Sequence, residues 1–192
     1  MFERLLLLIA MLAGFSGAST GAQQETYPAR PVRLVVPSTP GGGLDFSARV
    51  VGARLSTKWQ QQVIVDNRPG AAGIIGTDIA AKAAPNGYTL VLVSAEFAAM
   101  PFLYEKLPYA TSDFAPITLL VSLPFVVAAH PSVPVKTFKE LLAAAKEKPK
   151  QLTYASSGVG TTSHLGVMIL EKMTGVTLQH VPFKGAGAAV AS

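Results

Sequence analysis

The stretch at residues 32–55 constrains the fold more than any other part of the chain. An apolar run at 32–36 stops at a proline, the run Pro40-Gly41-Gly42-Gly43 follows, and apolar residues then recur at helical spacing as far as Leu55. This order predicts a buried strand, a tight glycine turn and the start of a helix. Glycine lets the backbone approach a ligand closely, and the first N–H groups of a helix have no intrahelical partner. The stretch can therefore bind an anion, with an ordinary strand-to-helix turn as the alternative.

A second stretch repeats this arrangement. A strand predicted at 152–156 is followed by Ser157-Gly158-Val159-Gly160-Thr161-Thr162-Ser163-His164 and by a helical pattern that runs to residue 173, where Gly175 ends it. The first glycine loop contains neither the Gly-Lys-Ser/Thr of a nucleotide-binding P-loop nor the G-x-G-x-x-G of a dinucleotide site. Two such loops in one chain indicate a ligand that is held between them.

The first half of the sequence alternates strands and helices. Strands are predicted at 32–36, 62–66 and 88–94, the last one almost wholly apolar and so buried. Between them we expect a helix that follows the glycine turn and ends near residue 59, and a helix at 72–83. This order predicts a parallel sheet with helices on both faces. Ligands of such sheets bind at the carboxyl ends of the strands, so we expect residues 38–45 and 94–97, Ser94 among them, to lie along one edge.

The second half is less regular. Residues 100–116 contain three prolines and predict a crossover into a second lobe, and residues 117–129 predict two apolar strand pieces split by Pro124. Thr137 and Glu140 have the spacing of a helix N-cap and its capping box. A strand at 176–181 and a new helix from residue 186 complete the pattern. This last helical pattern has no cap, and we expect the chain to be a truncated form.

Composition narrows the function classes. The 192 residues include no cysteine, which excludes disulfides, thiolate metal sites and a cysteine nucleophile. The net charge is +5, but the basic residues are scattered and no nucleic-acid-binding motif is present, so nucleic acid is not an expected partner. Residues 1–22 have the basic start, short apolar core and small-residue end of a signal peptide, with a membrane anchor as the alternative. We expect a periplasmic protein without cofactor or metal.

Four segments carry a family resemblance: YPARPVRLVVPSTPGGGLD, VDNRPGAAGIIGTDIAAKAAPNGYTLVLVS, LPYATSDFAPITLL and LTYASSGVGTTSHLGVMILEKMTGVTLQHVPFKG. In order and spacing they resemble the Bug-type receptors, the periplasmic solute-binding proteins of tripartite tricarboxylate transporters. The resemblance implies an α/β, two-lobed type II periplasmic binding (Venus-flytrap) fold, here incomplete at the C-terminus because the family's chains are longer. It divides the chain into a signal peptide at 1–22, a first lobe at 23–100 and a second lobe at 101–192.

The resemblance also implies a function and a site. A monomeric receptor that is not an enzyme would hold a small carboxylate, or a related acid or amide, between its lobes and pass it to the membrane subunits of the transporter. With Ser94 added from the sheet edge, the expected ligand-binding residues are Ser38, Thr39, Gly41, Gly42, Gly43, Asp45, Ser94, Ser156, Ser157, Gly158, Gly160, Thr161 and His164.

Alternatives stay open for single residues and for the function. Asp45 either orders the first loop or contacts the ligand, and His164 either bonds to the loop backbone as a buried polar residue or acts in acid–base chemistry. An exported hydrolase that uses Ser157 and His164 is a second function, although no nucleophile-elbow motif or triad spacing is present. A truncated chain without activity is a third.

Overall fold

Strand β1 (Val32–Val36) is the centre of a three-stranded sheet in the computed structural model, which describes residues 26–192. It pairs in parallel with β2 (Val63–Asn67) on one side and with β3 (Thr89–Val91) on the other. Val32, Val35 and Val36 are 0% exposed, which explains why the strand is apolar except at the half-buried Arg33. The predicted strand at 32–36 and the predicted parallel sheet are confirmed, whereas the signal peptide predicted at 1–22 lies outside the described residues.

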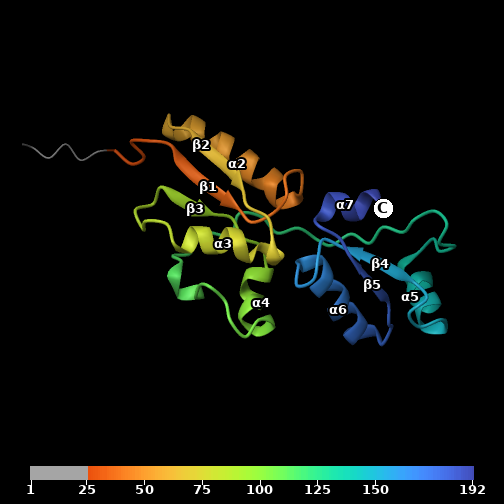
Figure 1. Ribbon diagram of the computed structural model, residues 1–192. Helices are drawn as coiled ribbons and strands as arrows, with labels where there is room; N and C mark the ends of the chain where they lie inside the picture. The colour runs from red at the N-terminus through yellow and green to blue at the C-terminus, as the bar shows by residue number, and fades with distance from the viewer. Residues whose placement is uncertain (1–25) are drawn as a thin grey trace, which may run out of the picture.

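Helices cover both faces of this sheet, as the alternation of elements predicts. Helix α2 (Gly43–Trp59) connects β1 to β2, and the 3-10 turn η1 (Ala71–Gly73) with helix α3 (Ile74–Ala81) connects β2 to β3. The strand order is β2-β1-β3, so the two connections run in opposite directions across the sheet. Since parallel crossovers are right-handed, the two helices come to lie on opposite faces (Figure 1).

The prediction for the third strand is wrong in length and burial. The strand covers Thr89–Val91 and not 88–94, and its residues are only half-buried, because β3 is an edge strand with a single partner. After it comes an unpredicted helix, α4 (Glu96–Leu103), which forms although it contains Pro101. Its Phe97 packs on Tyr109 and Phe114 on either side of the 3-10 turn η2 (Thr111–Asp113), so packing overrides the local preference against a helix.

A second, two-stranded sheet forms the other half of the structure (Figure 1). Strands β4 (Thr153–Ser156) and β5 (Gln179–Pro182) are parallel and are connected by α6 (Thr162–Thr174). Helix α5 (Phe138–Glu147) precedes this sheet and α7 (Ala186–Ala191) follows it. The predicted domain division after residue 100 stays a prediction, and it falls inside α4.

The caps of two helices in this half follow the sequence. The Thr137 Oγ1 accepts a hydrogen bond from the Glu140 N–H at the start of α5, as predicted. Gly175 ends α6 with a φ of +71°, also as predicted. Over residues 26–192, none of the helices combines the length and the apolar character that crossing a membrane requires.

The strand pieces predicted at 117–129 do not form. This segment runs from one half of the structure to the other without pairing to any described strand (Figure 1). Ile117, Leu119 and Val126 are 77%, 82% and 86% exposed. An apolar, β-branched sequence favours extended backbone, but a strand also needs a hydrogen-bonded neighbour, and the described sheets do not provide one here.

Gly76 offers a test of how closely α3 packs on the sheet. A Cβ at Gly76 would lie 2.6 Å from the carbonyl oxygen of Arg68 and 2.9 Å from the Cα of Pro37, whereas a Cβ at Gly52 in α2 would meet two valine side chains at 3.5 Å. Because backbone atoms cannot move aside easily, we expect Gly76→Ala to lower the free energy of unfolding by about 1–3 kcal/mol. Gly52→Ala should leave it unchanged or raise it by up to about 1 kcal/mol through helix propensity. Urea unfolding of both variants measures the difference, and equal stabilities would contradict the close approach.

Candidate functional site

The strands β1 to β5 all end at one cavity. Residues that follow their carboxyl ends line it, namely Ser38, Thr39, Gly42 and Gly43 after β1, 70–73 after β2, 93–97 after β3, 157–159, Thr161 and Thr162 after β4, and 183–186 after β5. The cavity has a volume of about 2660 Å³ and extends along the exposed segment 116–125. Pockets for small ligands usually enclose about 300–1000 Å³, so a small molecule would fill only part of this space.

Most of the residues that the sequence proposes as ligand contacts line this cavity: Ser38, Thr39, Gly42, Gly43, Ser94, Ser157, Gly158 and Thr161. The others do not reach its wall: Gly41, Asp45, Ser156, Gly160 and His164. Asp45, His164 and Ser156 accept hydrogen bonds from the N–H groups of Gly41, Gly160 and Gly158, so the structure separates the predicted set into lining residues and supporting residues.

Helix α2 begins at the cavity without a side-chain cap. Its N-cap is Gly42, which has no side chain that could accept from the first-turn N–H groups. The Gly41 N–H, one residue earlier, donates to Asp45 Oδ2 at 2.9 Å and is therefore already used. The N–H groups that follow carry the positive end of the dipole of a 17-residue helix, and Gly43 lines the cavity.

Helix α6 begins at the same cavity in the same way. Its N-cap is Thr161, but the hydroxyl of Thr161 donates to the Gly158 carbonyl at 2.7 Å and makes no capping bond. The 13-residue helix thus also starts without a side-chain cap. Two helix N-termini from different halves of the structure meet at one cavity, which favours a ligand with negative charge.

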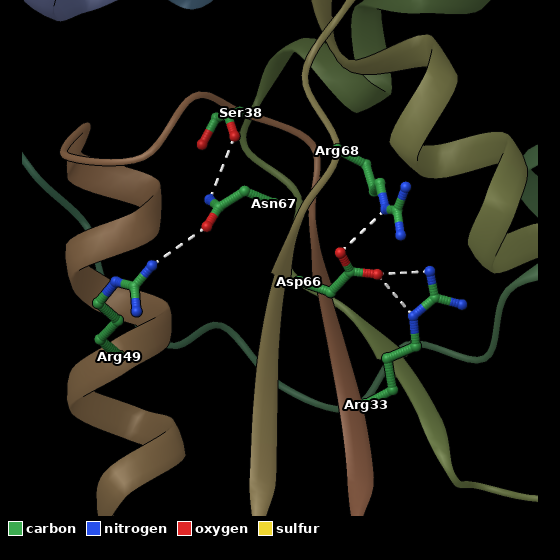
Figure 2. Close-up of polar contacts among 6 residues, drawn as sticks. All are labelled: Arg33, Ser38, Arg49, Asp66, Asn67 and Arg68. Carbon is green, nitrogen blue, oxygen red and sulfur yellow. Dashed lines mark hydrogen bonds and ion pairs between the residues drawn. The ribbon is translucent and has the colours of Figure 1, made fainter.

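A chain of polar contacts fixes the first glycine loop from behind (Figure 2). Asp45 is 3% exposed, and its Oδ2 accepts from Arg49 Nε at 3.0 Å as well as from Gly41. Arg49 Nη2 donates to Asn67 Oδ1 at 3.2 Å, and Asn67 Nδ2 donates to the Ser38 carbonyl at 3.2 Å. The loop is held at the Gly41 N–H and at the Ser38 carbonyl, and Asp45 orders it without reaching the cavity.

The end of β2 is held by a second set of contacts (Figure 2). Asp66 accepts from Arg33 Nε at 2.8 Å and from Arg68 Nε at 2.9 Å. Burial raises the pKa of Asp66, but the hydrogen bonds from the two arginines outweigh it and the net shift is downward. These contacts hold the chain where it turns toward Ala71 and Ala72, which have φ values of +47° and +51°.

The loop at 70–73 was not predicted as part of the site. It lines the cavity after β2, just as the glycine loop does after β1. Ligands bind at the carboxyl ends of parallel strands, so the position of this loop directly after the second strand is the signal in the sequence that points to it. Its strained alanines are a feature that sequence patterns do not reveal.

The second glycine loop is also supported from behind. Ser156 is 1% exposed, and its Oγ accepts from the Gly158 N–H at 3.1 Å and lies 2.6 Å from His180 Nε2. His164 Nδ1 accepts from the Gly160 N–H at 3.2 Å, and the rings of His164 and His180 stack with centroids 4.3 Å apart. His164 therefore bonds to the loop backbone. The sequence did not single out His180 as a site residue, because it follows no glycine motif and lies on a strand.

The two halves of the structure approach each other at two places. A Cβ at Gly185 would lie 2.7 Å from Thr39 Oγ1, and a Cβ at Gly160 would lie 3.5 Å from Tyr104 Oη. Lys184 is also part of the cavity lining. Among residues 26–192, no three or more His, Asp or Glu side chains lie together in a way that could hold a metal ion.

Asp45 provides a test of the support behind the first loop. The hydrogen bonds from Arg49 and then from Gly41 lower the pKa of Asp45 from 3.8 to about 2, against the opposing effect of burial. Ionised Asp45 therefore stabilises the fold above pH 3.8, and this contribution is lost as the pH falls toward about 2. We expect Asp45→Asn to lower the melting temperature at pH 7, and the difference from wild type to shrink between pH 4 and pH 2. A difference that does not change with pH would contradict the role of the charge.

Comparison with known proteins adds to this geometry. Residues 47–192 match the family described as "Tripartite tricarboxylate transporter family receptor". The chain is 36% identical to protein BugT of Bordetella pertussis over 190 residues, which are 97% of this chain and 58% of that protein. It spans little more than half the length of the curated relatives it matches.

Solved structures resemble it as well, each over 86% of this chain. The periplasmic binding protein BugD has a TM-score of 0.76 at 36% identity, over 56% of its own chain. An R. palustris protein with adipate has a TM-score of 0.78 at 33% identity, also over 56% of its chain. MatC from Rhodopseudomonas palustris with bound malate has a TM-score of 0.73 at 31% identity, over 57% of its chain.

Proposed function

Because this chain belongs to the tripartite tricarboxylate transporter receptor family, we propose that it binds a small carboxylate in the cavity between its two halves. The family membership confirms the resemblance to Bug-type receptors, and the likeness to BugD confirms the periplasmic-binding-protein fold. One observation carries the proposal: the N-termini of α2 and α6, neither with a side-chain cap, meet at one cavity. Such a pair of helix ends favours a ligand with a carboxylate.

The solved relatives support this class of ligand. Adipate and malate are both small carboxylic acids, and the proteins solved with them share the fold of this chain. In our proposal the carboxylate accepts from backbone N–H groups in the first turns of α2 and α6, as charged groups at helix ends commonly do. The hydroxyl groups of Ser38, Thr39 and Ser157 in the lining supply further donors, whereas those of Ser94 and Thr161 already donate to Glu96 and to the Gly158 carbonyl. The residues behind the loops, such as Asp45 and Ser156, act by holding these groups in place.

The wider role follows from the family. We propose that the protein is exported to the periplasm, that its two halves are the lobes of a Venus flytrap, and that it acts as a monomer which delivers its ligand to the membrane subunits of a tripartite transporter. The family match and the likeness to a periplasmic binding protein support this role.

The structure offers less support for a hydrolase. Ser157 and His164 bond to other groups: Ser157 Oγ lies 2.9 Å from Ser163 Oγ, and His164 Nδ1 accepts from the Gly160 N–H. Ser156 does pair with His180, but Ser156 is 1% exposed and does not line the cavity. A nucleophile has to reach its substrate, so this buried pair fits the support of a loop better than acyl transfer.

A thermal melt with matched ligands tests the proposed function. The full chain is melted alone, with adipate or malate, and with adipamide, which keeps the carbon chain of adipate but carries no charge. We expect an acid to raise the melting temperature and adipamide to have no effect, since a ligand that binds only the native state at a hundredfold excess over its Kd stabilises it by about 2.7 kcal/mol. If neither acid nor any other small mono-, di- or tricarboxylate raises it, the proposal is wrong.

Gly42→Ala tests where the carboxylate lies. Gly42 has an ordinary φ of −80°, and an added Cβ would meet only the Thr39 carbonyl oxygen at 3.6 Å, so the fold can accept the methyl group. The methyl group would stand in front of the first-turn N–H groups. Losing one hydrogen bond to a charged group costs about 1.5–3 kcal/mol, so we expect the affinity for the acid to fall by about tenfold or more.

The control for this variant is Gly52→Ala, which lies on the same helix away from the cavity. Calorimetric titration of both proteins with the same acid gives the two affinities, and thermal melts check that both fold. We expect the control to bind like wild type. Wild-type affinity in Gly42→Ala would mean that the carboxylate binds elsewhere.

A further inference from the structure

We propose that His180 is a positioning residue which, together with His164, makes ligand binding depend on pH. The second glycine loop (residues 156–161) keeps its binding geometry only while both imidazole rings are neutral. Acidification therefore releases the ligand. The inference rests on the proposed carboxylate binding. The inference adds to this binding a control by protonation, and the two histidines responsible lie outside the cavity lining.

The contact at His164 requires a neutral ring. Nδ1 of His164 accepts the hydrogen bond from the Gly160 N–H at 3.2 Å. A protonated imidazole carries hydrogens on both nitrogens and cannot accept. Protonation of His164 therefore places its Nδ1–H opposite the Gly160 N–H, and the hydrogen bond between them is lost. This frees the loop at Gly160, directly before the N-cap Thr161 of α6.

The contact at His180 reaches the other end of the loop. The Gly158 N–H donates to Ser156 Oγ at 3.1 Å, and Ser156 Oγ lies 2.6 Å from His180 Nε2, which accepts its hydrogen when the ring is neutral in that tautomer. When His180 is protonated, Nε2 donates instead. The hydroxyl hydrogen of Ser156 must then turn to the Gly158 carbonyl, 3.3 Å away. The proton on His180 thus changes the hydrogen bonding of the loop at Gly158.

The stacking of the rings couples the two ends. The centroids of His164 and His180 are 4.3 Å apart, so a charge on one ring disfavours a charge on the other. Tyr154 stacks on His180 at 4.8 Å and adds a neutral, apolar surface. Glu171 on α6 is the carboxylate whose charge acts on His180, and its Oε1 accepts from the Leu178 N–H at 2.7 Å.

The balance of these groups favours the neutral ring. Burial lowers the pKa of His180, His164 lowers it further, and Glu171 acts in the opposite direction without reversing the shift. The native state therefore loses stability as the pH falls below the ordinary value of 6.5 toward the lowered one. A charged histidine would also attract an anionic ligand, which is the opposite effect, so the sign of the pH dependence decides between them.

The test measures the affinity of the full chain for adipate, or for whichever acid binds best, by calorimetric titration from pH 8 to pH 5.5. We expect a constant affinity from pH 8 down to the ordinary histidine value of 6.5. Because the pKa of His180 is lowered, the affinity should decrease only below that value, with a slope that approaches about tenfold per pH unit, as one linked proton requires. In His164→Asn the amide oxygen replaces Nδ1 as an acceptor without a titrating group, and His180→Gln does the same for Nε2. Both variants should bind at pH 8 within about threefold of wild type and show a flatter profile.

His130→Asn is the matched control. His130 is exposed and contacts Ser132, and it does not line the cavity. This variant should keep the wild-type profile. The ligand's own protonation is the same in every protein, so differences between the profiles belong to the histidines. Affinity that rises on acidification, or a profile that neither substitution at the stacked pair changes, would overturn the inference.

A second measurement separates this inference from the proposed function. If no acid binds at pH 8, the proposed function has failed, and the loop can still be followed without ligand. The backbone amide resonances of Gly158 and Gly160 should titrate with pH in the NMR spectrum of the wild type, and that of Gly160 should not titrate in His164→Asn. A Gly160 amide that does not titrate in the wild type would overturn the inference by itself.

Discussion

The parallel pairing of β1 with both of its neighbours determines where everything else in the first half lies. Because all strands of this sheet run in one direction, their carboxyl ends meet at one edge, and the loops that follow them must share that edge. The right-handed crossovers then place α2 and α3 on opposite faces. The second sheet repeats the rule with β4 and β5, so two sheets present their carboxyl ends to the same cavity.

Polar residues at this cavity fall into two groups. Residues in the lining offer N–H and hydroxyl groups to the cavity. The supporting residues, such as Asp45, Asn67 and Ser156, hydrogen-bond to the backbone of the loops instead. A loop that is already held in its bound shape loses less conformational entropy when a ligand binds. The supporting groups are also the sensitive ones, because a buried polar group that loses its partner costs about 1–3 kcal/mol.

The segment that connects the two halves shows that a local sequence pattern does not by itself determine whether a strand forms. Residues 117–129 have the composition of strands, yet they cross from one half to the other as extended chain with exposed apolar side chains. Phe125 packs near α6, where a Cβ at Gly166 would lie 3.4 Å from its ring. Conversely, α4 forms around Pro101 because Phe97 joins an aromatic cluster with Tyr109 and Phe114. In both cases the neighbours decide the structure.

The sequence by itself determined the order of strands and helices, the parallel sheet, the caps at Thr137 and Gly175 and both glycine loops, because hydrophobic period, glycine and capping residues act over a few positions. Only the tertiary structure decided which of the predicted residues line the cavity and which support it. Asn67 meets Ser38, and His180 meets Ser156 and His164, through contacts between separate elements. No local pattern encodes such contacts, since they depend on how strands and helices pack in three dimensions.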